Sequence, residues 1–247
     1  MKNKIKRFIY PLSVILFFVL PLNSYSQTTT SQDVLLKMYN RYHNKWHKTL
    51  KFDQTTERFR NDSLISTATW YEQIVYPDLL RIDFNMPKSS GGVIFRHDST
   101  YRFRDNKVTR STKDENELIF FLGGMYFMPF DKVLNHFAAL HYDLSRFHMT
   151  MWKGKTAYVL GADKDDDKVN QLWIDQEKLV AVRFIKYDNN TKEEGLFEQQ
   201  IPLKGAWSET KCSFFINDKI LQVETYHDVV ADVPVDMNIF DPLMIGK

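Results

Sequence analysis

The sequence predicts a mainly β protein of the α+β class, in which a large curled antiparallel sheet forms an incomplete barrel covered by a few helices. From about residue 50 onward, apolar and polar side chains alternate with period two in short runs separated by turn residues, which is typical of half-buried strands. Helical spacing of apolar residues interrupts this pattern at 114–140 and precedes it at 31–48. The runs number roughly ten, at hairpin spacing and without βαβ alternation, so we expect one sheet.

The first 26 residues have the pattern of a secretory signal peptide. They hold four basic and no acidic residues, and their apolar part, residues 12–20, is shorter than the roughly 20 residues that span a bilayer. Small side chains at Ser24 and Ser26 suit cleavage ahead of Gln27. We therefore predict an exported, periplasmic protein, with a membrane anchor as the alternative role of this segment.

The remaining chain, residues 27–247, is predicted to be a single domain, because no linker or fixed-period repeat divides it. Cleavage would remove four of the 33 basic and none of the 31 acidic residues, so the 221 mature residues would carry a net charge of −2. This balance disfavours a nucleic-acid partner, since phosphate binding needs a basic surplus. The single cysteine, Cys212, cannot form an internal disulfide, and its apolar neighbours predict a small buried side chain.

The mature chain is predicted to begin with an amphipathic helix over residues 31–48, with Ser31 as its N-cap. Period-two alternation then predicts a meander of hairpins that includes strands over 79–84, 93–98 and 101–104. We expect one face of these strands to meet the core and the other to meet water.

A helix-patterned insert over residues 114–140 interrupts the strands, and Pro129 suits the first turn of its second helix. A chain of hairpins does not need this insert for its connections, so we expect it to cover one face of the sheet. Strand patterns then resume at 147–152, 158–160, 172–175, 179–187, 196–201, 207–216 and 220–230.

Two patterns resemble metal sites but lack required residues. The acidic run 163–168 would need glycine at the sixth and glutamate at the twelfth position of a calcium-binding EF-hand loop, and it has neither. We interpret it as a solvated hairpin tip. His43 and His47 share a helix face, but Asn44 stands where a zinc protease needs glutamate, so solvated or capping histidines are favoured. We predict no metal and no cofactor.

No nucleophile or phosphate-binding motif indicates an enzyme, since neither G-x-S-x-G nor a P-loop occurs. Carboxylates such as Glu72, Asp83 and Glu224 could pair in the fold, but a chain with 31 acidic residues offers many such pairs. We predict a protein that is not an enzyme and has no catalytic residues. A hydrolase would require a nucleophile within hydrogen-bond reach of one of the seven histidines.

The aromatic content is high, with 19 Phe, 12 Tyr and five Trp, and these residues fall on the apolar positions of the strands. One interpretation is an ordinary core. The other is that a curled sheet of this size cannot fill its concave side, which leaves an apolar cavity suited to lipid beneath the helices. The candidate cavity residues are Trp70, Ile74, Leu80, Ile82, Phe84, Phe95, Phe103, Phe121, Phe137, Phe147, Met149 and Met151.

The order of elements resembles the outer-membrane lipoprotein carrier (LolA-like) superfamily. The resemblance rests on the signal peptide, the first helix, the helical insert and the segments WYEQ (70–73), LLRIDF (79–84), AYVL (157–160), LWID (172–175) and VPVDMNIF (233–240). It implies an incomplete β-barrel that binds lipid or lipoprotein acyl chains in the periplasm of a two-membrane bacterium. The residue directly after the predicted cut is Gln27 and not a lipid-accepting cysteine, which matches the soluble carrier of that system rather than its anchored receptor. The carrier's lid-contacting arginine has no assignable counterpart, because Arg81 and Arg96 alternate onto the expected outer face.

The function predicted from these features is non-covalent binding of lipid or lipoprotein acyl chains by a soluble periplasmic protein, extending to a lipoprotein-sorting carrier with membrane-bound sorting components as partners. The segment 114–140 would open and close over the ligand. The alternative is a structural or interaction module of the cell envelope that has no ligand and binds a protein through strand edges or the acidic tip.

Overall fold

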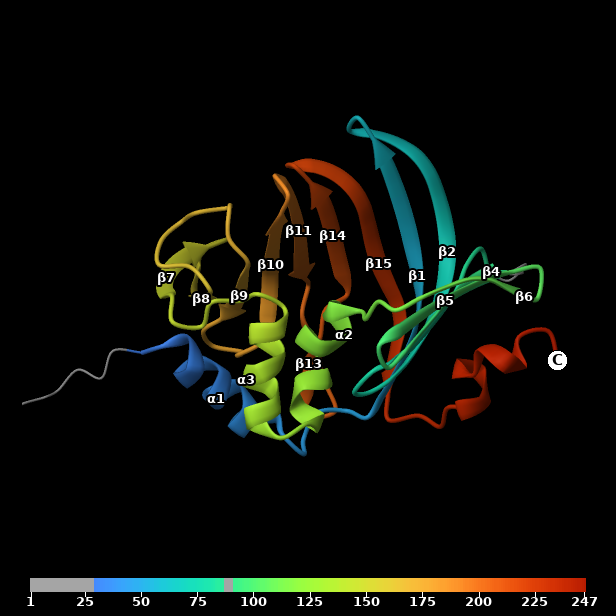
Figure 1. Cartoon of the computed structure of the whole chain (residues 1–247), viewed down its shortest axis with the longest axis horizontal. Helices are drawn as coiled ribbons and strands as arrows, with labels where there is room; N and C mark the ends of the chain where they lie inside the picture. The colour runs from blue at the N-terminus through green and yellow to red at the C-terminus, as the bar shows by residue number, and fades with distance from the viewer. Residues whose placement is uncertain (1–28, 87–90) are drawn as a thin grey trace, which may run out of the picture.

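The computed structural model describes residues 29–86 and 91–247, and the predicted signal peptide and its cleavage site lie outside them. Thirteen of the 15 strands in the described residues form one antiparallel sheet (Figure 1). The strands are β1 (Thr49–Arg60), β2 (Ser63–Val75), β3 (Leu79–Asp83), β4 (Gly91–Arg96), β5 (Ser99–Arg104), β6 (Lys107–Thr112), β7 (Phe147–Trp152), β8 (Lys155–Leu160), β9 (Gln171–Asp175), β10 (Ala181–Asp188), β11 (Thr191–Glu198), β12 (Ile201–Leu203), β13 (Ala206–Ser208), β14 (Lys211–Ile216) and β15 (Lys219–Ala231).

The main sheet has 13 strands in the order β6-β5-β4-β3-β2-β1-β15-β14-β11-β10-β9-β8-β7, and β12 pairs with β13 separately. It curls around one side without closing, since β6 and β7 are its two edges (Figure 1). This confirms the predicted incomplete barrel. The strand count exceeds the expected ten, partly because the run 207–216 is divided between β13 and β14 by a turn at Glu209 and Thr210.

Helix α1 (Ser31–Tyr42) is shorter than the helix predicted over residues 31–48, and its N-cap lies one residue before the predicted one. Thr30, rather than Ser31, is the N-cap: its hydroxyl accepts from the Asp33 backbone N–H at 3.1 Å, and the Asp33 carboxylate accepts from the Thr30 N–H at 2.9 Å. This reciprocal pair is a capping box. The helix ends at Tyr42 because Asn44 takes a left-handed conformation (φ 63°) that turns the chain toward β1.

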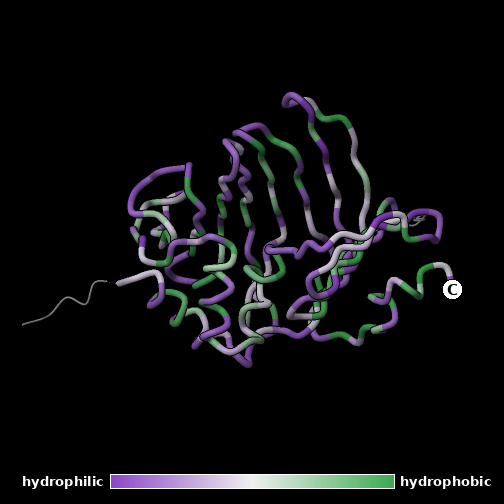
Figure 2. The backbone as a smooth tube through the Cα atoms, viewed as in Figure 1, coloured by the Kyte–Doolittle hydropathy of each residue, from purple (hydrophilic) through white to green (hydrophobic). Residues whose placement is uncertain are grey.

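The predicted helical insert forms α2 (Glu117–Phe121), the 3-10 turn η1 (Gly124–Phe127) and α3 (Phe130–Ala139). These elements lie with α1 on the concave side of the sheet (Figure 1). Figure 2 shows hydrophobic colour along this cover and alternating colour along the long strands. At the α2–η1 junction, a Cβ on Gly123 (φ 154°) would collide with Trp46 and Tyr76, so only glycine allows the cover to approach this closely.

The C-terminal segment, residues 233–247, packs on the opposite face of β3, β4 and β5. Its 3-10 turns η2 (Met237–Phe240) and η3 (Pro242–Met244) bring Phe240 against Ile94 and Phe103 in a small separate core. Arg81 links the layers: it binds Asp83 and donates to the backbone carbonyl of Ile239 at 3.0 Å. Arg81 is therefore on the outer face, as predicted, but it lies beneath this segment.

Candidate ligand cavity

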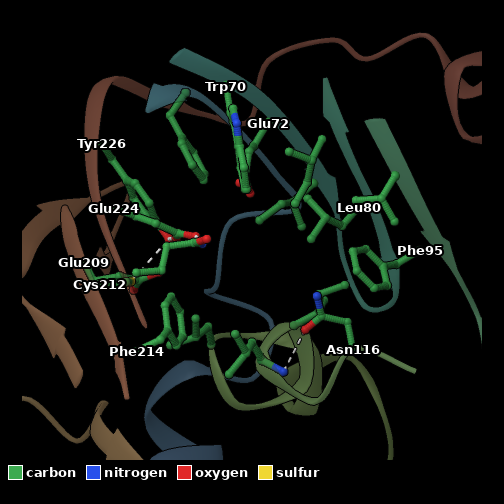
Figure 3. A pocket seen from close by; sticks show the side chains of 18 of the residues that line it. Trp70, Glu72, Leu80, Phe95, Asn116, Glu209, Cys212, Phe214, Glu224 and Tyr226 are labelled. Atoms are coloured by element: carbon green, nitrogen blue, oxygen red, sulfur yellow. Dashed lines mark hydrogen bonds between the residues drawn. The ribbon is translucent and has the colours of Figure 1, made fainter. Parts of the chain in front are cut away.

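A cavity of about 370 Å³ lies between the concave face of the sheet and α2. Its volume falls within the range of small-molecule sites. Figure 3 shows its side chains converging from the β2–β3–β4 wall, from the β14–β15 wall and from α2. Six of the candidate residues line it, namely Trp70, Ile74, Leu80, Ile82, Phe84 and Phe95.

Strand register explains why these six residues meet. Paired residues on antiparallel strands point to the same face, and Ile74 of β2 pairs with Leu80 of β3, which in turn pairs with Phe95 of β4. Trp70 lies two positions along the same face from Glu72, and its ring packs against Phe84 at 4.5 Å. Period-two alternation thus produces a continuous apolar wall.

Three acidic residues also line the cavity, two of them across from the apolar wall and one on β2 among its apolar residues. Glu72 of β2, Glu224 of β15 and Glu209, in the turn between β13 and β14, all line the cavity and are each at least nine-tenths buried. The carboxylate of Glu224 accepts from Gln222 Nε2 at 2.6 Å and from the Tyr226 hydroxyl at 3.2 Å. Glu72 has no hydrogen-bond partner among the described residues, and its carboxyl group points into the cavity (Figure 3). We call these three residues the acidic wall.

Burial and mutual repulsion change the protonation of the acidic wall. Burial, reinforced by the nearby Glu224 and Glu209, raises the pKa of Glu72 well above its ordinary value. Burial raises the pKa of Glu209 to about 7. It also raises the pKa of Glu224, although hydrogen bonds from Gln222 and Tyr226 favour the charged form. Near neutral pH, the Glu209 carboxyl therefore exchanges between a neutral form that can donate a hydrogen bond and a charged form.

Polar groups around the acidic wall are buried as well. Cys212 is 1% exposed, which confirms its predicted burial, and its Sγ lies 3.2 Å from the Tyr226 hydroxyl. Burial raises the pKa of this thiol well above its usual range. Gln54 of β1 is fully buried, donates to Thr56 Oγ1 at 2.9 Å, and leaves its own Oε1 without a partner among the described residues.

The rim of the cavity carries positive charge. Arg58 and Arg102 line the cavity and are exposed, and the Arg58 guanidinium lies 5.0 Å from the centre of the Trp70 ring. Asn116, at the α2 side, uses its side chain to cap the helix through the Leu118 N–H at 3.0 Å. The site therefore combines an apolar wall, a buried acidic wall and an exposed basic rim.

Solved structures of similar fold cover nearly the whole described chain. A DUF1329 family protein from Desulfovibrio piger matches with a TM-score of 0.58 and 12% identity over 87% of this chain and 97% of its own. A domain from Vibrio parahaemolyticus described as a putative outer membrane lipoprotein-sorting protein matches with a TM-score of 0.57 and 10% identity over 87% of this chain and 97% of its own. A LolA superfamily protein from Nitrosomonas europaea matches with a TM-score of 0.51 and 12% identity over 84% and 96%. The fold is LolA-like.

At the level of sequence, no known family profile matches the chain. No curated protein matches it either. The LolA-like fold nevertheless confirms the resemblance drawn from the segments on β2, β3, β8 and β9. At 10–12% identity these likenesses establish the fold alone.

In the structure of this protein, the other six candidate residues lie outside the cavity. Phe103 pairs with Gly92 and points to the outer face, where the missing glycine side chain leaves room for its ring. Phe121 and Phe137 face each other within the helical cover at 5.8 Å. Three more lie on the distant edge strand β7, where Phe147 packs on Tyr158, and Met149 and Met151 are 47% and 64% exposed.

Several lining residues were not among the candidates. The sequence drew attention to Glu72 and Glu224 only as carboxylates that could pair, and to Cys212 only as a buried side chain. In the structure, Glu72 and Glu224 both line the cavity but form no direct hydrogen bond with each other. Alternation along β15 places Gln222, Glu224 and Tyr226 on one face, but this polar pattern resembles a solvated strand. Further lining residues come from the helical cover and the β11–β14 wall: Leu118, Ile119, Leu122, Phe197, Glu209 and Phe214.

Of the two histidines expected to be solvated or capping, His43 caps a helix and His47 is neither solvated nor a cap. His43 is the C-cap of α1, and its Nδ1 lies 2.8 Å from the Tyr126 carbonyl oxygen. His47 is 2% exposed, and burial lowers its pKa to about 4, so it is neutral at physiological pH. Across residues 29–86 and 91–247, no group of three His, Cys, Asp or Glu residues is arranged to hold a metal ion.

The acidic run 163–168 is exposed, but it is attached to the sheet by ion pairs rather than freely solvated. Asp163 binds Arg146 at 2.9 Å, and Asp167 binds Lys192 at 2.8 Å. Among the described helices, none is both long and apolar enough to cross a membrane.

Proposed function

We propose that this protein is exported to the periplasm and binds lipid or lipoprotein acyl chains without covalent chemistry, as a carrier with a LolA-like fold. The observation that carries the proposal is the cavity of about 370 Å³ with its apolar β2–β3–β4 wall. Each CH₂ group transferred from water to such a surface contributes roughly 0.8 kcal/mol, so a single acyl chain would be a substantial ligand.

The proposed mechanism uses the helical cover as the movable part. The segment 114–140 lies over the cavity and contributes Leu118, Ile119 and Leu122 to its lining. Displacement of this segment would admit an acyl chain, and its return would exclude water. The known similarity to a lipoprotein-sorting domain supports a role in lipoprotein sorting, with membrane-bound components as the further partners.

The test is to purify the mature chain from the periplasm of a two-membrane bacterium, extract it with organic solvent and identify co-purified lipid by mass spectrometry. Ile82→Trp would fill the cavity, and we expect the recovered lipid to fall about tenfold or more. Ile65→Trp is the matched control, because Ile65 is 53% exposed on the β1–β2 hairpin and lines no part of the cavity.

Circular dichroism would establish that both variants fold. Recovery of no lipid from the unsubstituted protein, together with no binding of a fluorescent fatty-acid probe, would contradict the proposed function. Equal loss of lipid in both variants would show that the ligand lies elsewhere.

The alternative, an interaction module without a ligand, is favoured by the edge strand β7. Its exposed Met149 and Met151 leave an apolar stripe beside unpaired backbone, which suits strand addition by a partner. Co-purification of a stoichiometric protein, lost in Met151→Glu, would support this role.

A further inference from the structure

The acidic wall is unusual because it borders a cavity that is otherwise apolar. A carrier that only needed to shield acyl chains would gain nothing from three buried carboxyls, since each costs free energy to bury unless it is paired. The side-chain carboxyl groups of Glu72 and Glu209 accept no hydrogen bond from another residue within the described chain, and Glu72 is 5% exposed. Hydrogen bonds to these two carboxyls must therefore come from whatever occupies the cavity, either water or a ligand that displaces it.

A second observation comes from a different residue. Gln54 Oε1 is buried behind the same face, beside Trp70 and Tyr226 in the strand register, and it lacks a donor in the described part of the protein. Carboxylates and an amide oxygen are all acceptors. Gln54 does not line the cavity, so the group that meets the acidic wall has the Glu72 and Glu209 carboxyls to bind: N–H or O–H donors suit them, and a positive charge would offset the charge that they develop.

We propose that the cavity selects an amphiphile with a primary ammonium group, which the acidic wall binds while the apolar tail lies against Leu80, Ile82 and Phe95. This inference rests on the proposed function and names its ligand class. An ammonium group supplies three donors on a compact cation. The geometry allows both contacts at once, because Glu209 and Glu224 lie across the cavity from Leu80 and Phe95, and Glu72 pairs with Ile82 on the apolar side (Figure 3).

Other charged and titratable groups that line the cavity are compatible with this assignment. Arg58 and Arg102 are exposed at the rim, where water screens their charges. Burial raises the pKa values of Tyr76, Cys212 and Tyr226, so all three remain neutral. Ammonium binding would displace protons from the acidic wall, and affinity should therefore increase as the pH rises through about 7, where Glu209 titrates.

The experiment is calorimetry of the mature chain with dodecylamine, dodecanol and dodecanoate below their aggregation concentrations. At pH 8, we expect dodecylamine to bind about tenfold or more tightly than either of the others, which corresponds to one charge-assisted hydrogen bond. The preference should shrink at pH 5.5, and proton release should appear as a dependence of the heat on the buffer.

Glu72→Gln keeps the shape of the side chain and removes its ionisable carboxyl without breaking a protein hydrogen bond. It should weaken dodecylamine binding about tenfold and leave dodecanol binding unchanged. Glu57→Gln is the matched control, because Glu57 lies on the same sheet but on the opposite face from the lining residues of β1. It should change neither affinity.

The outcomes separate the two proposals. Dodecanol or dodecanoate binding as tightly as dodecylamine, or an unchanged affinity in Glu72→Gln, would overturn the ammonium inference and leave the lipid-binding proposal in place. Failure of all three amphiphiles to bind would overturn both.

Discussion

The two halves of the concave face have the same strand pattern but different contents. Over β8–β10, Phe137 and Phe121 of the helical cover pack against Tyr142 and Phe184, and the space is filled by protein. Over β1–β4, β14 and β15, the same sheet encloses a cavity. The difference lies in the cover, because α1, α3 and Phe121 at the end of α2 supply large side chains to the first half, whereas the second is met only by Leu118, Ile119 and Leu122.

This contrast shows how one sheet can provide both stability and binding. Well-packed aromatic residues stabilise the fold, while unfilled apolar surface and buried carboxyls reduce that stability and remain available to a ligand. Variants in the packed half should therefore change mainly the free energy of unfolding, whereas variants in the cavity half should change mainly ligand binding.

The largest effect should come from truncation in the packed half. Phe137 is fully buried, so Phe137→Ala should lower the free energy of unfolding by about 3–5 kcal/mol, through lost burial and a new void. Phe95→Ala, in the cavity half, should cost less than half as much, because its ring already borders empty space. Urea denaturation would measure both, and equal losses would mean that the two halves are equally well packed.

The next effect is the pH dependence of stability caused by the acidic wall. The pKa of Glu209 is raised in the folded state from 4.5 to about 7, so its stabilising contribution is complete below pH 4.5 and is lost as the pH rises through 7. This loss amounts to about 3 kcal/mol for the one group. Glu209→Gln should flatten the decline between pH 5 and pH 8, as followed by urea denaturation at each pH.

Glu57→Gln is again the control, since Glu57 lies outside the cavity and should leave the decline unchanged. A pH profile of Glu209→Gln that overlays that of the unsubstituted protein would show that Glu209 is ionised normally.

An intermediate effect should follow from loosening the junction between the halves. Gly123→Ala would place a Cβ against Trp46 and Tyr76, and we expect a loss of about 1–3 kcal/mol as the cover shifts. Hydrogen exchange should increase in residues 117–139 more than in the sheet. Unchanged exchange there would show that the cover tolerates the added methyl group without moving.

The smallest effect should come from the cap of α1. Thr30→Ala removes the hydroxyl that accepts the Asp33 N–H, at a cost of about 1 kcal/mol. Because α1 covers the packed half, ligand binding should be unaffected. Thr30→Ser would retain the cap and serve as the control. A loss of affinity in Thr30→Ala but not in Thr30→Ser would reveal coupling between the halves.

The sequence predicted the sheet and the β2–β3–β4 wall because period-two alternation is a local property. It could not predict the orientation of every strand: Phe95 and Phe103 both occupy apolar positions, yet hairpin register sends the first inward and the second outward. The mutual packing of Phe121 and Phe137 depends on how α2 and α3 dock, which a single chain pattern does not specify. Glu209 lies in a turn, where no periodicity marks a residue that faces a cavity.

The C-terminal segment affects how the cavity can change its volume. Because Phe240 and the Arg81–Ile239 contact brace the outer surface of β3–β5, that wall has side-chain packing on its back as well as its front. A sheet supported in this way resists flattening. To hold a bulkier ligand, the cavity is therefore expected to expand toward α2 and away from the braced strands. In this way the C-terminal segment, which packs on the other face of the sheet, sets the direction in which the helical cover moves.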